Sequence, residues 1–232
     1  MRLDDLAVVI PIGPGDDAWR GLVPQLAPLP AAARLVLAAT TAGDLPAAGD
    51  PACAALAAEV LCLTAPRGRA LQQNAAARAA GRRFLWFLHA DSRLAPTTLP
   101  ALARALDRRP GGLGFFDLRF RDDGPAAVGL NAVGVMVRSR WLGLPFGDQG
   151  FFLAHATFER LGGFDPGLAD GEDHALVWAA WRARVPLVPA RAPIYTSARK
   201  YAEQGWLNTT ARHVWLTVRQ AWREGRRAGL PT

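Results

Sequence analysis

The sequence predicts an α/β fold with a mixed, mainly parallel sheet flanked by helices. Three observations predict it: short apolar runs of strand length recur, helix-length segments separate them, and turns rich in glycine or proline join the two. Apolar runs without alternation are typical of strands that helices cover on both faces. Right-handed crossovers are expected to connect the parallel strands. The 232 residues suffice for one large domain or two small ones.

The elements are expected in a fixed order along the chain. Continuous apolar runs predict strands at 6–11, 34–39, 59–63, 84–88, 111–120 and 151–153. Helices are expected at 51–58, where Pro51 lies near the start, at 70–80, which Gly81 ends, and at 97–108, 131–140 and 175–184. A last helix, at about 209–224, is amphipathic, with Trp215 and Trp222 on its apolar face and arginines on another. Such a helix packs on its domain or, as the alternative, lies on an anionic membrane surface.

Charge and cysteine content narrow the class of protein. The formal net charge is +7 and the sequence pI is about 10.8, with Lys200 as the only lysine. Arginine forks bind phosphate and carboxylate, so an anionic ligand is expected. The arginines are scattered, without interleaved stacking aromatics, so no nucleic acid partner is expected. Cys53 and Cys62 are expected to be buried thiols of a reduced, cytoplasmic protein, and no signal peptide or membrane-spanning run is visible.

The stretch 84–92 carries the most informative side chains. Five apolar residues lead directly into His89, Ala90 and Asp91. Ligand-binding groups of parallel sheets lie just past the carboxyl ends of the strands. Asp91 would therefore be a hard oxygen ligand at the mouth of a crevice; alternatively, it caps or turns the chain before the next helix.

Two other loops are expected at the same edge of the sheet. The loop after the first strand contains Asp16 and Asp17, which are candidates for nucleotide recognition or for capping the following helix. Arg67, Gly68 and Arg69 precede the helix at 70–80, where backbone N–H groups, the helix dipole and guanidinium groups combine into an anion site. The alternative for this second loop is a solvated basic turn, with the amides of the following helix at the surface.

The order of these motifs resembles that of family 2 glycosyltransferases, the bacterial GT-A enzymes. The matching pieces are a first strand ending in Ile10-Pro11, then Arg67-Gly68-Arg69, Asn74, His89-Ala90-Asp91, Gly147-Asp148-Gln149, Gly162-Gly163-Phe164 and Glu172-Asp173. More narrowly, the chain looks like a small branch with His-Ala-Asp in place of Asp-x-Asp, some members of which are known as radical-SAM/selenodomain-associated transferases. The resemblance covers Val8 to about Trp222. It implies one Rossmann-like GT-A domain over 1–232: a nucleotide-binding half at about 1–92, an acceptor and catalytic half at about 93–205, and a C-terminal helix at about 206–232.

The resemblance also implies a donor and a cofactor. The donor is a UDP- or GDP-linked sugar whose diphosphate is bridged by Mg²⁺ or Mn²⁺, and Asp91 matches the carboxylate that coordinates the ion. His89 contacts the ribose or diphosphate or is a weak metal ligand, and His213 is a second weak candidate. The residues expected at the nucleotide sugar are Pro11, Asp16, Asp17, Arg67, Gly68, Arg69, Asn74, His89, Ala90, Arg199 and Lys200.

For catalysis, the resemblance assigns the Glu-Asp motif to Glu172 and Asp173. Asp173 would be the general base that deprotonates the acceptor hydroxyl in an inverting transfer; without the resemblance, the pair is an acidic first turn of a helix. Asp148 is the second candidate for the base. Gly147, Asp148, Gln149 and Trp206 are expected on the acceptor side. The acceptor itself, whether a small molecule, a glycan or a lipid-linked molecule, is left open, as is peripheral contact with the inner face of a membrane.

One departure from the family pattern keeps other functions open. The second strand ends in Ala38-Ala39-Thr40-Thr41, without the acid that contacts the base in typical members. A catalytically impaired nucleotide- or glycan-binding relative is one alternative. A nucleotidyltransferase is another, although it needs a basic residue in the loop after the first strand, and the loop at 12–17 has none.

Overall fold

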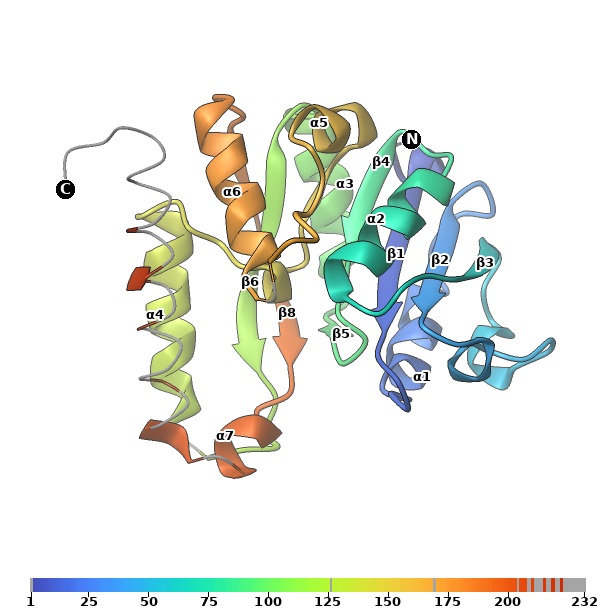
Figure 1. Ribbon diagram of the computed structural model, residues 1–232, viewed down its shortest axis with the longest axis horizontal. Helices are drawn as coiled ribbons and strands as arrows, with labels where there is room; N and C mark the ends of the chain where they lie inside the picture. The colour runs from blue at the N-terminus through green and yellow to red at the C-terminus, as the bar shows by residue number, and fades with distance from the viewer. Residues whose placement is uncertain are drawn as a thin grey trace.

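A computed structural model of the chain describes residues 2–125, 127–168, 170–203, 205–207, 210, 215, 218, 219 and 222. These residues form an eight-stranded sheet with the order β3-β2-β1-β4-β7-β6-β8-β5 (Figure 1). The strands are β1 (Leu6–Ile12), β2 (Arg34–Ala39), β3 (Glu59–Thr64), β4 (Phe84–Phe87), β5 (Arg93–Leu94), β6 (Leu113–Phe120), β7 (Phe152–Ala154) and β8 (Leu187–Thr196). β1 to β4 are parallel, as are β6 and β8, whereas β7 and β5 run antiparallel to their neighbours. The sheet is thus mixed and mainly parallel, which confirms the predicted fold class.

Helices cover both faces of this sheet. The α-helices are α1 (Trp19–Leu22), α2 (Arg69–Ala79), α3 (Thr98–Arg108), α4 (Val128–Arg140), α5 (His155–Arg160), α6 (Glu172–Arg182) and α7 (Arg199–Glu203). Short 3-10 helices are η1 (Arg2–Asp5), η2 (Val23–Leu26), η3 (Ala42–Asp44), η4 (Pro51–Cys53) and η5 (Gly147–Gln149). Side chains of α1, η2 and α3 pack on one face, and those of α2, α5 and α6 pack on the other. α4 lies at one end of the molecule, beside β6 (Figure 1).

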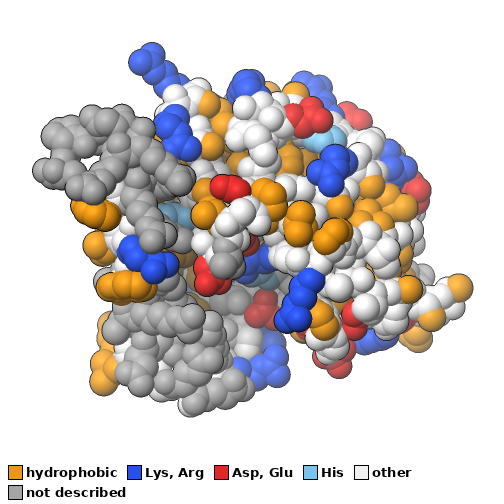
Figure 2. Space-filling view, viewed as in Figure 1, with side chains coloured by type: hydrophobic (Ala, Val, Ile, Leu, Met, Phe, Trp, Pro, Cys, Tyr) orange, Lys and Arg blue, Asp and Glu red, His pale blue; other side chains and the backbone are white. Residues whose placement is uncertain are grey.

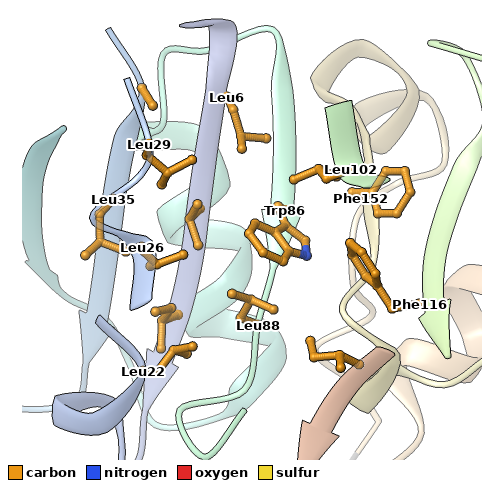
Figure 3. Close-up of a cluster of buried hydrophobic side chains, with 14 of the residues drawn as sticks. Leu6, Leu22, Leu26, Leu29, Leu35, Trp86, Leu88, Leu102, Phe116 and Phe152 are labelled. Atoms are coloured by element: carbon orange, nitrogen blue, oxygen red, sulfur yellow. The ribbon is translucent and has the colours of Figure 1, made fainter. Parts of the chain in front are cut away.

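The alternation of side chains along β1 explains why both faces need a cover. Leu6, Val8 and Ile10 point into the core with α1 and α3, whereas Ala7 and Val9 point into the core with α2. Trp86 of β4 lies at the centre of the first core, where its ring centroid is 5.6 Å from that of Phe116 (Figure 3). Since β1 is fully buried, any chemistry can only lie where the strands end.

Three local expectations were wrong. The helix expected at 51–58 is only the 3-10 turn Pro51–Cys53, capped by the Asp50 side chain. Cys62 is exposed, because β3 is an edge strand that is covered incompletely, and Cys53, at the end of η4, is half-buried. β8 was not predicted, because it contains Pro189 and Pro193. The short β5 pairs only with the last residues of β8, so most of this edge of β8 is unpaired and tolerates prolines, which lack a backbone N–H.

The predicted C-terminal helix at 209–224 falls mostly outside the described residues. Thr210, Trp215, Val218, Arg219 and Trp222 are helical, and Trp215, Val218 and Trp222 are more than half exposed. No helix within the described ranges has the length and hydropathy needed to cross a bilayer. On the face drawn in Figure 2, basic side chains are distributed rather than gathered in one stripe.

Candidate functional site

The carboxyl ends of β1, β2 and β4 and the start of α2 enclose a first cavity of about 370 Å³. Parallel strands end at one edge of the sheet, so side chains that lie far apart in the sequence meet there. The lining consists of Pro11, Gly13, Pro14, Asp16, Thr40, Arg67, Gly68, Arg69, Gln72, His89, Ala90 and Asp91. Asp91 and the Arg67–Arg69 loop, which were predicted separately, therefore face one space.

A second cavity, of about 890 Å³, lies between α4, η5, α7 and the ends of β6 and β8. Its lining is Arg69, His89, Asp91, Leu118, Phe120, Leu130, Asn131, Gly134, Val135, Arg138, Phe146, Asp148, Thr196, Ser197, Arg199, Tyr201, Trp206, Thr210 and Val218. Arg69, His89 and Asp91 line both cavities. These three side chains thus mark the boundary at which a ligand in one cavity would meet a ligand in the other.

Asp91 reaches this boundary because the chain leaves the sheet directly after β4. Leu88 makes the last sheet contact, donating its N–H to Val9 at 2.9 Å, and a turn closed by Ser92 N–H and His89 C=O at 3.1 Å follows. The Thr196 hydroxyl donates to Asp91 Oδ2 at 3.3 Å. Asp91 does not cap a helix, because the next one begins only at Thr98. Its carboxylate is left facing the cavities.

Arg69 is held at the boundary by Glu172, the first residue of α6. Glu172 is buried, and its Oε1 accepts a short hydrogen bond from Arg69 Nε. Burial alone would lower the pKa of Arg69, but the hydrogen bond and charge of Glu172 raise the pKa overall. Gly68 precedes the helix with φ at +137°, a conformation that favours glycine. Glu172 therefore holds the Arg69 guanidinium in a fixed position beside the cavities.

Asp173 and Asp148 have different surroundings. Both oxygens of Asp173 accept backbone N–H groups, from Gly147 at 2.6 Å and from His174 at 2.8 Å, and Asp173 lines neither cavity. Asp148 lines the second cavity, and its buried Oδ1 has no hydrogen-bond partner among the described residues. Burial raises the pKa of Asp148, although the charges of Arg138 and His89 oppose the rise.

Arg138 comes from α4 and lines the second cavity together with Asp148. Its guanidinium carbon lies 3.2 Å from the centroid of the Phe146 ring, and burial lowers the pKa of Arg138. Gln149 is buried and holds the η5 turn, donating to Phe116 C=O at 2.8 Å and accepting from Phe146 N–H at 3.1 Å. η5 is therefore fixed on both sides of Asp148.

The structure brings together most of the predicted site residues. Those in the first cavity are Pro11, Asp16, Arg67, Gly68, Arg69, His89, Ala90 and Asp91, and those in the second include Asp148, Arg199 and Trp206. Asp17, Asn74, Gly147, Gln149, Glu172 and Asp173 line neither cavity. Both amide atoms of Asn74 bond the backbone of Phe164, at 2.7 and 3.0 Å. The Lys200 side chain and His213 fall outside the described part of the chain.

Sequence reasoning missed two residues of the site. Thr40 follows β2 in the way that Asp91 follows β4, and its buried hydroxyl in the first cavity has no partner among the described residues. Its position directly after a strand was the available signal. Arg138 was missed as well, although its spacing from Asn131 and Gly134 along α4 places all three on one helix face.

The residues at the boundary could bind a divalent ion only if a bound ligand supplied further coordinating atoms. Within the described ranges, no three His, Cys, Asp or Glu side chains cluster closely enough to hold a metal ion by themselves. Mg²⁺ is commonly bound by one or two carboxylates together with substrate phosphates. Asp91 offers such a carboxylate beside the Arg67–Arg69 loop, so the residues present suit an ion that arrives with a phosphate ligand.

No protein-family model and no curated protein matches the chain. Among solved structures, S. aureus TarS superposes with a TM-score of 0.63 and 16% identity, over 84% of this chain and 37% of that one. The mannosyltransferase PcManGT from Pyrobaculum calidifontis, in complex with GDP-Man and Mn²⁺, gives 0.61 and 18% over 82% and 56%. TarS 1–349 with UDP-GlcNAc gives 0.59 and 15% over 83% and 58%.

The fold is of the GT-A type. At these identities the likeness establishes the fold and not the activity. The chain spans between 37% and 58% of the length of these neighbours. A GT-A fold binds its ligand past the carboxyl ends of its strands, which is where the first cavity lies.

Proposed function

We propose that this protein transfers a sugar from a nucleotide-diphosphate sugar to a hydroxyl of an acceptor. One observation carries the proposal: two cavities meet at Arg69, His89 and Asp91. The donor would occupy the first cavity and the acceptor the second, so that the reacting atoms meet at the boundary. The GT-A fold supports this arrangement, because solved structures with that fold contain UDP-GlcNAc and GDP-Man.

The donor's phosphates fit the Arg67–Arg69 loop. Gly68 N-caps α2, so the first backbone N–H groups of that helix and the positive end of its dipole face the cavity. Arg67 and Arg69 add two guanidinium groups. The hydroxyl of Thr40 and the carboxylate of Asp16 are the polar groups left to contact the nucleoside at the ends of β2 and β1. We propose UDP or GDP as the nucleotide, as in the neighbours.

Asp91 would hold a Mg²⁺ or Mn²⁺ ion together with the donor's diphosphate. The ion would supply charge neutralisation for the departing nucleoside diphosphate. Arg69, which Glu172 fixes in place, faces the same phosphates and stabilises the same charge. Arg199, from the start of α7, is a further cation in the second cavity.

We propose Asp148 as the general base of an inverting reaction. The acceptor oxygen attacks the anomeric carbon, the bond from that carbon to the diphosphate oxygen breaks with its electron pair, and the hydroxyl proton passes to the Asp148 carboxylate. Asp148 lines the acceptor cavity and has an oxygen without a partner among the described residues. Asp173 stays a prediction as the base, but its two backbone hydrogen bonds favour a positioning role for η5.

The order of His89-Ala90-Asp91, Gly147-Asp148-Gln149 and Glu172-Asp173 supports membership of glycosyltransferase family 2. Within it, we propose the small branch that includes the radical-SAM/selenodomain-associated transferases. Contact with a membrane surface stays a prediction; in its favour, Leu130 of α4 and Trp141 just beyond it are 67% and 83% exposed.

Melting temperature measured with UDP-GlcNAc or GDP-Man, each with and without Mn²⁺, tests donor binding. We expect a rise in Tm only when donor and ion are both present, because Asp91 by itself supplies too few coordinating atoms to bind the ion without the donor's phosphates. Asp91→Asn should abolish the rise. Asp107→Asn, at an exposed position of α3 that lines neither cavity, is the matched control and should keep it. A rise without any sugar transfer would instead indicate a catalytically impaired relative.

A further inference from the structure

We propose that the second cavity binds an acceptor alcohol with a long apolar body, whose hydroxyl points to the boundary with the first cavity. This inference rests on the proposed function, since it names the acceptor class for the same site. The cavity of about 890 Å³ lies within the range of roughly 300–1,000 Å³ that small-molecule sites occupy. It is large enough for a whole acceptor molecule rather than a single sugar ring.

Most of the surface that lines the cavity is apolar, although Asn131, Arg138, Thr196, Ser197, Arg199, Tyr201 and Thr210 also belong to the lining. The apolar part combines aliphatic side chains from β6, α4 and the C-terminal part of the chain with aromatic ones from β6, from the residue before η5 and from the segment after α7. These are Leu118, Phe120, Leu130, Val135, Phe146, Trp206 and Val218. Aromatic rings alone would also suit a sugar, but four aliphatic side chains favour an alkyl or polyisoprenoid body, which has no hydroxyl groups to hydrogen-bond.

Several uncharged polar groups of this lining are already hydrogen-bonded within the protein. Asn131 Oδ1 accepts the Trp206 indole N–H at 3.0 Å, and Asn131 Nδ2 donates to the Thr210 hydroxyl at 3.0 Å. The Ser197 hydroxyl donates to Asp123 at 2.9 Å. A glycan here would bury several hydroxyl groups with few free partners, which costs binding free energy. An apolar body has no hydroxyl groups to pair, so its binding does not carry this cost.

Charged groups gather at the opposite end of the cavity. Arg69, His89 and Asp91 form the boundary, and Asp148 lines the same cavity. The carboxylate of Asp148, which lines the cavity, is the kind of acceptor that a buried hydroxyl needs. A molecule with one hydroxyl and an apolar tail therefore has one favourable orientation, with the hydroxyl at the donor and the tail toward α4.

The tail end opens at the surface of α4. Leu130 lines the cavity and is also 67% exposed, and Val133 on the same helix is 55% exposed. Hydrophobic side chains are visible along the α4 edge of the molecule, at the left of Figure 2. A tail longer than the cavity would leave it across an apolar rim.

Two glycines of α4 provide a matched test. A Cβ at Gly134 or at Gly129 would meet no atom within 4 Å, so a larger side chain fits at either position. Either substitution also replaces glycine, a poor helix former, inside α4. Only Gly134 lines the cavity. Gly134→Leu should occupy part of the cavity and obstruct a bound tail, whereas Gly129→Leu should leave the cavity unchanged.

The probe is 1-decanol, titrated without donor and followed by tryptophan fluorescence, because Trp206 lines the cavity. Maltotriose is the polar probe. We expect saturable binding of 1-decanol to the wild type and to Gly129→Leu, binding at least tenfold weaker in Gly134→Leu, and no saturable response to maltotriose. If Gly134→Leu does not fold as the wild type does by circular dichroism, Gly134→Met, with an unbranched side chain, replaces it.

The inference is overturned if 1-decanol does not bind, if Gly134→Leu binds it as the wild type does, or if maltotriose binds in its place. Since these titrations contain no nucleotide sugar, they are independent of the proposed reaction. Decanol binding that depends on Gly134, together with no transfer from any donor, would retain the cavity assignment and reject the reaction. Transfer to polar acceptors only would reject the acceptor class and retain the reaction.

Discussion

Asp148→Asn and Asp173→Asn should separate catalysis from structure, because the two carboxylates differ in their partners. Asparagine keeps the shape of aspartate and removes its charge. For Asp148, losing the general base should lower kcat by about 10²–10⁴-fold, which corresponds to about 3–5 kcal/mol of barrier at 1.36 kcal/mol per tenfold. Binding of the donor should persist, because Asp148 lies on the acceptor side of the boundary.

Although Asp148→Asn should lower kcat, it should not lower the stability of the fold. The folded state raises the pKa of Asp148 through burial. Such a group stabilises the fold below its unfolded pKa, and this contribution is lost as pH rises through the folded pKa. At neutral pH the buried carboxylate therefore opposes folding, and the free energy of unfolding of Asp148→Asn should equal or exceed that of the wild type.

Asp173→Asn should lower stability instead. Its oxygens accept N–H groups from Gly147 at 2.6 Å and from His174 at 2.8 Å. An amide nitrogen in place of one oxygen faces an N–H donor, so at least one charge-assisted hydrogen bond is lost, at about 1.5–3 kcal/mol. For a chain of this size, that lowers Tm by roughly 3–12 °C at about 2–4 °C per kcal/mol. Turnover should fall less than in Asp148→Asn.

The assay combines release of nucleoside diphosphate at saturating donor with a melting curve for each variant. Asp148 is not the base if Asp173→Asn loses turnover at unchanged Tm and donor binding while turnover of Asp148→Asn stays within tenfold of the wild type. That result would assign the base to Asp173.

Two further predictions concern pH dependence and packing. Arg138→Gln removes a charge that lowers the pKa of Asp148, so the acid limb of kcat/KM should move to higher pH; an unchanged limb would contradict the coupling of the two groups. Gly114→Ala places a Cβ 1.9 Å from the buried Phe152 ring, so the free energy of unfolding should fall by about 1–3 kcal/mol. Gly111→Ala meets no atom within 4 Å and serves as the control in urea unfolding; equal losses in both variants would show that the collision relaxes at no cost.

The strands that the sequence predicted correctly are those whose burial leaves a simple pattern. β1 and β4 are buried on both faces, so each appears as a continuous apolar run. β8 mixes buried with half-buried positions and contains two prolines, and prolines oppose a strand assignment unless the neighbouring strands are known. Cys62 was misplaced because apolar neighbours do not reveal that β3 is an edge strand.

The site, like the fold, could be predicted only in part from the sequence. The topology of parallel strands brought His89, Asp91 and Arg69 to one edge, as expected from the position of each after a strand or before a helix. Sequence alone does not show which polar side chains are already satisfied inside the fold. Asn74 was expected at the nucleotide, but it holds the backbone of Phe164. These are long-range contacts that no local pattern encodes.

The role of Asp91 in donor binding can be checked in a crystal structure of the protein grown with Mn²⁺ and UDP or GDP, with data collected at the manganese absorption edge. We predict an anomalous peak within about 2.0–2.6 Å of an Asp91 carboxylate oxygen, with the diphosphate between that ion and the Arg67–Arg69 loop. A nucleotide bound elsewhere, or an ion in this cavity without contact to Asp91, would contradict this prediction.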